Sequence, residues 1–338
     1  MKFLPILTDR TRTEVDWTCG RKRYYGFEYD ITGITKPEAA WALRFGIKVH
    51  DALLTLVSKG ESPNFYTNLI QELKVLHSDP SSQNALEMAH IGTGLVYCFY
   101  RRILPKLLGT YEILMIPGLV AAEMEVVLPI SKDLLWMAKP DLLLRHKQTG
   151  GVWYLDYKTT GSSSADWVNQ WSKSVQLHMT GKAIEKTIGE PVEGMVIVGF
   201  YKGYNRDQRQ NSVFSYGWGK KGNGGLGDQF SSEYVRGWQR FPTHLYPSGF
   251  QKWLDMIPEE TLVKQFPMTA PIFINEGMVE KLVAQVHYRE QAISRAIGML
   301  EDNPPPLARE MILRANFPQD FRQCEPMYGD PCQFRECC

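Results

Sequence analysis

Two neighbouring segments, residues 139–144 and 152–159, most strongly constrain how this 338-residue chain can fold. Both are rich in aliphatic and aromatic residues, and the run Gln-Thr-Gly-Gly that ends at Gly151 is typical of a tight turn. We therefore expect an antiparallel hairpin. Pro140 has no backbone N–H and suits the start of a strand better than its interior, so Asp141 should lie at a strand entrance.

The second strand of this hairpin carries a carboxylate and a lysine on one face. Asp156 and Lys158 are two positions apart, and side chains alternate between the faces of a strand. The hairpin would bring Asp141 alongside them. Two carboxylates offer the oxygen ligands that Mg²⁺ or Mn²⁺ prefers, and a lysine can stabilise charge that develops on a phosphate. A structural Asp–Lys pair on an exposed strand face is the alternative.

Hydrophobic periodicity places the hairpin in an α/β chain. It predicts helices over 37–60, 83–104, 165–187 and 275–302, and strands over 118–129, 136–145, 152–159 and 193–201. Strands in the middle flanked by helices favour a mixed central sheet covered by helices. We expect one domain over 1–338, with a helical part at 17–60, a sheet core at 118–201, a loop at 202–240 and a cysteine-rich tail at 320–338.

The balance of charge predicts no partner for the whole chain, because the net charge is +1. The loop at 202–240 is different, since basic residues there are interleaved with aromatic ones. Such a mixture suits single-stranded nucleic acid, and the alternative is a solvated loop whose aromatic rings fold back onto the core. The basic residues that we expect to contact nucleic acid are Lys202, Arg206, Arg209, Lys220 and Lys221.

Several classes of protein are disfavoured by the sequence. The apolar run 113–127 contains Pro117, Glu123 and Glu125 and is too short to span a bilayer. Residues 1–17 carry charges and lack the apolar segment of a secretion leader, so we expect a soluble cytoplasmic protein without a membrane partner. The phosphate-binding motif of ATP-driven motors is absent, so any helicase must be a separate partner.

Taken in order, these segments resemble the RecB-like branch of the PD-(D/E)XK nuclease superfamily. The run 46–50, which ends in His50, resembles its G-x-x-x-H helix, where the histidine is a metal ligand. The run 176–180 resembles its Q-x-x-x-Y helix, with Thr180 in place of the tyrosine. Glu123 or Glu125 stands where the family often has an acidic residue, and strand alternation would put both on one face.

The resemblance implies a restriction-endonuclease-like core and a metal-dependent DNA nuclease, preferably an exonuclease acting on DNA ends or single strands in recombination, repair or phage DNA metabolism. The Mg²⁺ or Mn²⁺ ligands that it implies are His50, Asp141, Asp156 and the carbonyl of Tyr157. Lys158 would stabilise the transition state and Gln176 would position Lys158 or the substrate. A non-catalytic DNA-binding module of the same fold and a structure-specific endonuclease remain alternatives. Taken alone, His50 is a satisfied core histidine and Gln176 a surface or capping glutamine.

The six cysteines give a further clue, because four of them fall within the last fifteen residues. Cys19, with the basic residues and paired tyrosines that follow it, resembles AddB-type and CRISPR-associated members of the branch that bind an iron–sulfur cluster. The ligands implied for a [4Fe–4S] cluster, which would join the two chain ends in one lobe, are Cys19, Cys324, Cys332 and Cys338. Cys337 competes with Cys338, and zinc or no metal remains open. Cys98 is expected to be a buried helical cysteine.

Overall fold

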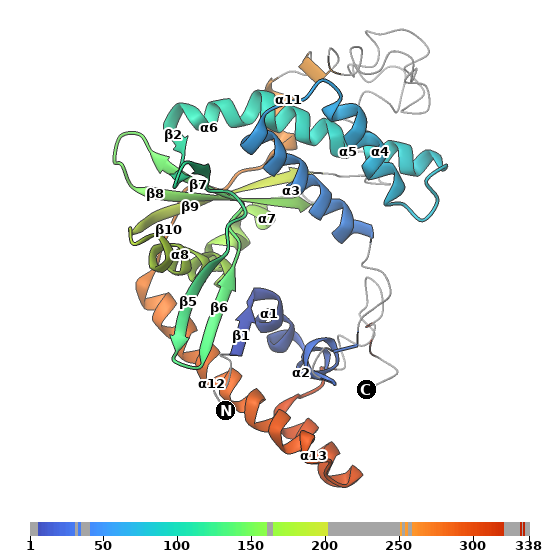
Figure 1. Cartoon of the computed structure of the whole chain (residues 1–338), viewed down its shortest axis with the longest axis vertical. Coiled ribbons are helices and arrows are strands. Elements are labelled where there is room, and N and C mark those ends of the chain that lie inside the picture. The colour runs from blue at the N-terminus through green and yellow to red at the C-terminus, as the bar shows by residue number, and fades with distance from the viewer. Residues whose placement is uncertain are drawn as a thin grey trace.

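The computed structural model describes residues 6–30, 33–34, 41–160, 165–201, 251, 254–255, 259–320, 332 and 334. Within them the chain forms the predicted mixture of helices and mixed β-sheet (Figure 1). The predicted basic loop at 202–240 lies outside the described residues. None of the described helices is both long and apolar enough to cross a membrane.

A five-stranded sheet forms the centre of the fold, in the order β10-β9-β8-β7-β2. Strands β8 and β9 are parallel and the other neighbours are antiparallel. The predicted hairpin is confirmed, since Leu142 lies opposite Leu155 and Gly150 adopts a left-handed φ of 74° in the turn. The strands span Tyr111–Ile113 (β2), Leu142–His146 (β7), Val152–Thr160 (β8), Val192–Tyr201 (β9) and Ile272–Phe273 (β10).

Helices cover one face of this sheet and form the larger core. In Figure 1 they lie above the central strands. Phe45, Val49 and Leu53 recur every four residues on the first of these helices and are fully buried, as the periodicity predicted. The helices are α3 (Trp41–Lys59), α4 (Phe65–Val75), α5 (Gln83–Cys98) and α6 (Leu104–Thr110), with a π-helical turn η2 (Phe99–Ile103) between α5 and α6. The helical segment that was predicted over 83–104 therefore extends to Thr110 and contains a π-helical turn.

The opposite face is covered by the connection between β8 and β9. This connection consists of α7 (Ala165–Asn169), a 3₁₀ turn η3 (Gln170–Lys173) and α8 (Val175–Ile188). The sequence predicted one continuous helix over 165–187, and this is wrong because Ser174 is extended, with ψ of 120°. Leu177 and Ala183 of α8 pack with Tyr154 of β8 in a second core.

A second, three-stranded sheet has the order β1-β6-β5 and comprises Ile6–Asp9 (β1), Val126–Ser131 (β5) and Leu134–Ala138 (β6). The predicted strand over 136–145 is wrong as a single element, since its halves belong to two sheets as β6 and β7. The break falls at Pro140, which cannot donate to a ladder. The predicted strand over 118–129 is also interrupted, because 121–125 form no strand between β4 (Leu119–Val120, paired with β3, Met115–Ile116) and β5.

The described N-terminal helices pack against the last two described helices in one lobe at the lower end of Figure 1. Its helices are α1 (Arg10–Thr18), α2 (Gly20–Arg23), the π-helical η1 (Tyr24–Glu28), α12 (Glu276–Glu301) and α13 (Pro306–Asn316). Helix α11 (Glu259–Gln265) is not part of this lobe and lies near the helix-covered face of the five-stranded sheet. Helix α12 matches its prediction, whereas α13 was not predicted. Gly20 lies so close to Phe317 that a Cβ would come within 2.8 Å of its backbone.

Candidate metal centre

His50 projects from α3 toward the start of β7. Its Nδ1 lies 2.8 Å from Oδ1 of Asp141, and its ring packs edge-on against Tyr157 at 5.8 Å between centroids. One turn earlier, Gly46 faces Thr159, whose Oγ1 would lie 3.1 Å from an added Cβ. The absence of a side chain at Gly46 thus lets α3 approach β8 closely and brings His50 to the sheet.

Asp141 occupies the position where the β7–β8 ladder stops. Strand β7 begins at Leu142, so Asp141 lies just before the strand. Its side chain, and not its backbone carbonyl, accepts the next hydrogen bond from β8. Oδ2 of Asp141 accepts a hydrogen bond from the backbone N–H of Tyr157. The same carboxylate turns its other oxygen to His50, and its residue is only 6% exposed. The prediction that Asp141 lies at a strand entrance next to β8 is confirmed.

Glu123 is the acidic residue that reaches this place. Its Oε1 lies 3.7 Å from Nδ1 of His50, and its N–H donates to the carbonyls of Pro140 and Asp141 at 3.0 and 3.3 Å. Glu123 has a φ of 51°, which is uncommon for a residue other than glycine. Glu125 is instead 60% exposed and pairs with Lys139 at 3.2 Å. The expectation that both glutamates share a face is wrong, because 121–125 form no strand.

His50, Glu123 and Asp141 each offer one ligand atom, and these three atoms lie within 4.8 Å of one another. Beside them is a small hollow that is also lined by Leu53, Val57 and other apolar side chains. Two carboxylates and one imidazole suit Mg²⁺ or Mn²⁺, with the imidazole favouring Mn²⁺ of the two. The residues present therefore fit the ion that the sequence implied.

The pKa values of these groups depend on their burial and on the charges of the neighbouring groups. Burial alone would lower the pKa of His50, but the Asp141 carboxylate outweighs it and raises the pKa above its ordinary value. Burial raises the pKa of Asp141, the charge of His50 opposes that rise, and the Asp156 carboxylate adds to it. Lys158 in turn lowers the pKa of His50. The two predicted β8 residues are thus within electrostatic reach of the cluster.

Asp156 and Lys158 form an ion pair on β8, as strand alternation predicted. Asp156 is 3% exposed, and Lys158 is half-buried. Their register partners on β9 are Ile197 and Gly199. Among the described residues, Asp156 is not one of the three whose ligand atoms meet within 4.8 Å, so its expected role as a metal ligand stays a prediction.

Two further predicted residues flank the cluster. Tyr157 donates its N–H to Asp141, and its ring packs against Phe99 and Phe200 at 5.2 and 5.5 Å. The role predicted for its carbonyl is untested. Gln176 lies in the first turn of α8, and its Oε1 is buried without a hydrogen-bond partner within the described segments. Its predicted contact with Lys158 or substrate stays a prediction.

Sequence reasoning missed a pair of tryptophans on the connection after β8. The ring of Trp171 lies 5.9 Å from Nζ of Lys158, measured to the ring centroid, and Trp167 packs edge-on against it at 5.6 Å. Two tryptophans four positions apart, directly after the strand that carries Lys158, are the signal that indicates such a contact.

Only some of the predicted cluster cysteines lie within the described residues. Cys19 is 4% exposed at the junction of α1 and α2, and Cys332 is half-buried. Cys324, Cys337 and Cys338 lie outside the described residues, as do Lys202, Arg206, Arg209, Lys220 and Lys221. The ring of Phe334 lies 6.1 Å from that of Tyr25, so the tail reaches the N-terminal segment. Cys98 is fully buried at the end of α5, as expected.

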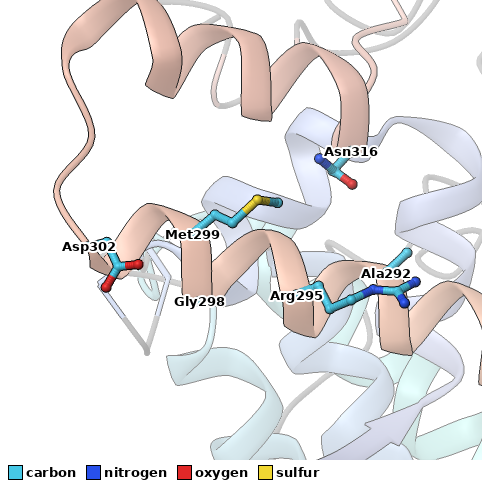
Figure 2. A pocket seen from close by; sticks show the side chains of 6 residues that line it. All are labelled: Ala292, Arg295, Gly298, Met299, Asp302 and Asn316. Carbon is cyan, nitrogen blue, oxygen red and sulfur yellow. The ribbon is translucent and has the colours of Figure 1, made fainter.

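A separate hollow lies over α12 and α13. Figure 2 shows Arg295 and Met299 on α12, Asp302 directly after the end of α12, and Asn316 at the end of α13 around it. In Figure 1 these helices lie below the central sheet, whereas α3 lies above it. The only group of three metal-ligating side chains found in the described part of the chain is the one at His50.

Comparisons with known proteins do not assign the chain to a family, because no protein-family model and no curated protein sequence matches it. The function must therefore be argued from the geometry of His50, Glu123, Asp141, Asp156 and Lys158.

Proposed function

We propose that this protein is a metal-dependent deoxyribonuclease that hydrolyses phosphodiester bonds, with a PD-(D/E)XK core. One observation carries the proposal. A histidine and two carboxylates from three separate segments converge within 4.8 Å. The buried Asp156 and the half-buried Lys158 form an ion pair on the adjoining strand within electrostatic reach. A purely structural arrangement would not need five ionisable groups together where all are at least partly removed from solvent.

The fold supports the proposal. The resemblance implies a mixed central sheet flanked by helices, with the Pro-Asp and D-x-K segments on adjacent strands. Strands β7 and β8 are adjacent and antiparallel, and the five-stranded sheet is mixed and covered on both faces. The sheet also takes β2 and β10 from outside the expected 118–201 core.

Each residue has a chemical task in the proposed reaction. A bound Mg²⁺ or Mn²⁺ would activate a water molecule and offset charge on the phosphate. His50, Glu123 and Asp141 would hold that ion. The ammonium of Lys158, held beside the Asp156 carboxylate, would stabilise the negative charge that develops on the phosphate oxygens. The Tyr157 N–H fixes the orientation of the Asp141 carboxylate before substrate binds.

The substrate and partners of the proposal come from the resemblance. The substrate is DNA, at ends or in single strands, and the preferred mode is exonucleolytic. The cellular process is recombination, repair or phage DNA metabolism in the cytoplasm, beside a separate helicase or recombination protein. A [4Fe–4S] cluster on Cys19 and the cysteines of the tail is part of the same proposal. The contact of Phe334 with Tyr25 supports it, because the tail is thereby close to the segment that follows Cys19.

End-labelled linear DNA tests the proposal. The wild type, purified without oxygen so that a cluster survives, should degrade it with Mg²⁺ or Mn²⁺ and not with EDTA. Asp156→Ala and Lys158→Ala should be inactive while still folded. Cleavage of circular single-stranded DNA would favour the structure-specific endonuclease. DNA binding by an intact protein that cuts none of the linear or branched substrates would make the non-catalytic binding module the better account.

A further inference from the structure

The sheet face that carries Asp156 and Lys158 is covered by two indole rings. Ring contacts place Trp171 over the ammonium of Lys158, 5.9 Å from ring centroid to Nζ, and Trp167 edge-on to Trp171 at 5.6 Å. Both tryptophans come from α7 and η3, the segment that follows β8. Trp171 is 8% exposed and belongs to the second core, so its ring is held in place by packing.

Gly199 leaves room for the ring of Trp167 against the sheet. It is the register partner of Lys158 on the parallel strand β9. A Cβ on Gly199 would lie 2.6 Å from the ring of Trp167, so any side chain there would displace it. Lys158, Gly199 and the two rings therefore form one packed arrangement, in which Trp167 supports Trp171 from the side.

The ammonium of Lys158 is bounded on two sides. The carboxylate of Asp156 pairs with it, and the face of Trp171 lies next to it. An indole face attracts a cation and restricts the rotamers of a long lysine side chain. Nothing in the nuclease resemblance assigns a role to either tryptophan.

We propose that Trp171 is a positioning residue that holds the Lys158 ammonium beside Asp156 through the face of its indole ring. The role of Lys158 in catalysis rests on the proposed function, but the position of its ammonium does not. Trp171 itself touches neither substrate nor metal in this account. It acts through Lys158, and Trp167 acts through Trp171.

The test measures the position of Lys158 without any nuclease assay. Reductive methylation of surface amines, followed by mass spectrometry, gives the rate at which Lys158 is modified relative to Lys132, whose side chain is 89% exposed. Trp171→Met fills the core without a ring and should raise the relative rate about two- to fivefold. Trp171→Phe keeps a ring face and should stay close to wild type. Circular dichroism spectra that match the wild-type spectrum would show that both variants are folded.

A second measurement covers the case in which a variant does not fold. Fluorinated tryptophan has nearly the same ring shape as tryptophan, but its ring face is less negative and attracts a cation less strongly. In wild-type protein made with it, Lys158 should be methylated faster, while the rate at Lys132 should not change. Equal rates in all forms, or equal increases in Trp171→Met and Trp171→Phe, would overturn the proposal whether or not the protein cuts DNA. If the rates change as expected but wild type is inert on DNA, only the proposed function fails. With an active enzyme, Trp171→Met should lower kcat and leave KM for DNA unchanged.

Discussion

Nδ1 of His50 lies 2.8 Å from Oδ1 of Asp141 although the two residues are 91 positions apart in the chain. The other carboxylate oxygen of Asp141 accepts a hydrogen bond from the N–H of Tyr157, so both oxygens have a partner. The ring nitrogen of His50 and a carboxylate oxygen of Asp141 are thereby close to a carboxylate oxygen of Glu123, and the three atoms could bind one metal ion. This relationship explains why β7 begins at Leu142 and not at Asp141.

Replacing Asp141 with Asn should weaken metal binding while preserving the fold. The amide oxygen can still accept from Tyr157, but the negative charge that attracts a cation is lost. We expect affinity for Mn²⁺, measured by electron paramagnetic resonance of the free ion, to fall at least about tenfold. Unchanged affinity in a folded Asp141→Asn protein would exclude this carboxylate from the metal site.

Replacing Arg23 with Met should destabilise the lobe that joins the chain ends. Arg23 is 1% exposed and donates to both carboxylate oxygens of Glu290 at 3.1 and 3.0 Å. Removing one partner leaves a buried charge uncompensated, which costs about 3–5 kcal/mol of unfolding free energy in urea titrations. The matched control is Arg314→Met, because Arg314 pairs with Glu310 at the surface and its loss should cost less than about 1 kcal/mol. Similar losses in both variants would contradict the prediction.

His90 should make the protein less stable in mild acid. Burial lowers its pKa to about 4, below the ordinary value of 6.5, so the unfolded state binds more protons between these two values. The unfolding free energy should therefore fall as the pH drops below 6.5, by about 2 kcal/mol between pH 7.5 and pH 5 from this residue. His90→Gln cannot titrate and should lose correspondingly less stability over the same range. Identical pH dependence of the two proteins would rule this out.

Cys19 and Cys98 give a matched pair for the proposed cluster. Both are buried. Burial raises the pKa of the Cys98 thiol well above its usual range, so this thiol stays protonated and is a poor ligand. After purification without oxygen, Cys19→Ala should contain much less iron and sulfide than wild type, and Cys98→Ala should contain as much. A wild type that holds zinc, or no metal at all, at its cysteines would contradict the iron–sulfur proposal.

Local patterns in the sequence predicted the parts of the site that depend on one element. Strand alternation places Asp156 beside Lys158, and the Gly150 turn places Asp141 opposite them. The four-residue spacing that ends in Leu53 predicted α3 and its buried face. In each case the period of the apolar residues fixes both the element and the face that is buried, so no knowledge of distant contacts is needed.

The remaining features depend on contacts that a single segment does not encode. The choice of Glu123 over Glu125 follows from the hydrogen bonds of Glu123 to Pro140 and Asp141, which replace a strand with a bend. The division of 136–145 between two sheets depends on which strands pair. The Arg23–Glu290 pair joins positions 267 apart, and nothing local marks either residue as buried.

The comparison of Glu123→Gln with Glu125→Gln tests the central claim most directly. Both changes remove one negative charge within three positions of the chain, but only Glu123 lies beside His50. With Mn²⁺ and end-labelled DNA, we predict that Glu125→Gln cuts at nearly the wild-type rate and that Glu123→Gln is slower by at least about tenfold, with weaker Mn²⁺ binding. Equal rates and equal Mn²⁺ affinities in the two variants, or a folded wild type that cuts no DNA with either metal, would contradict the account.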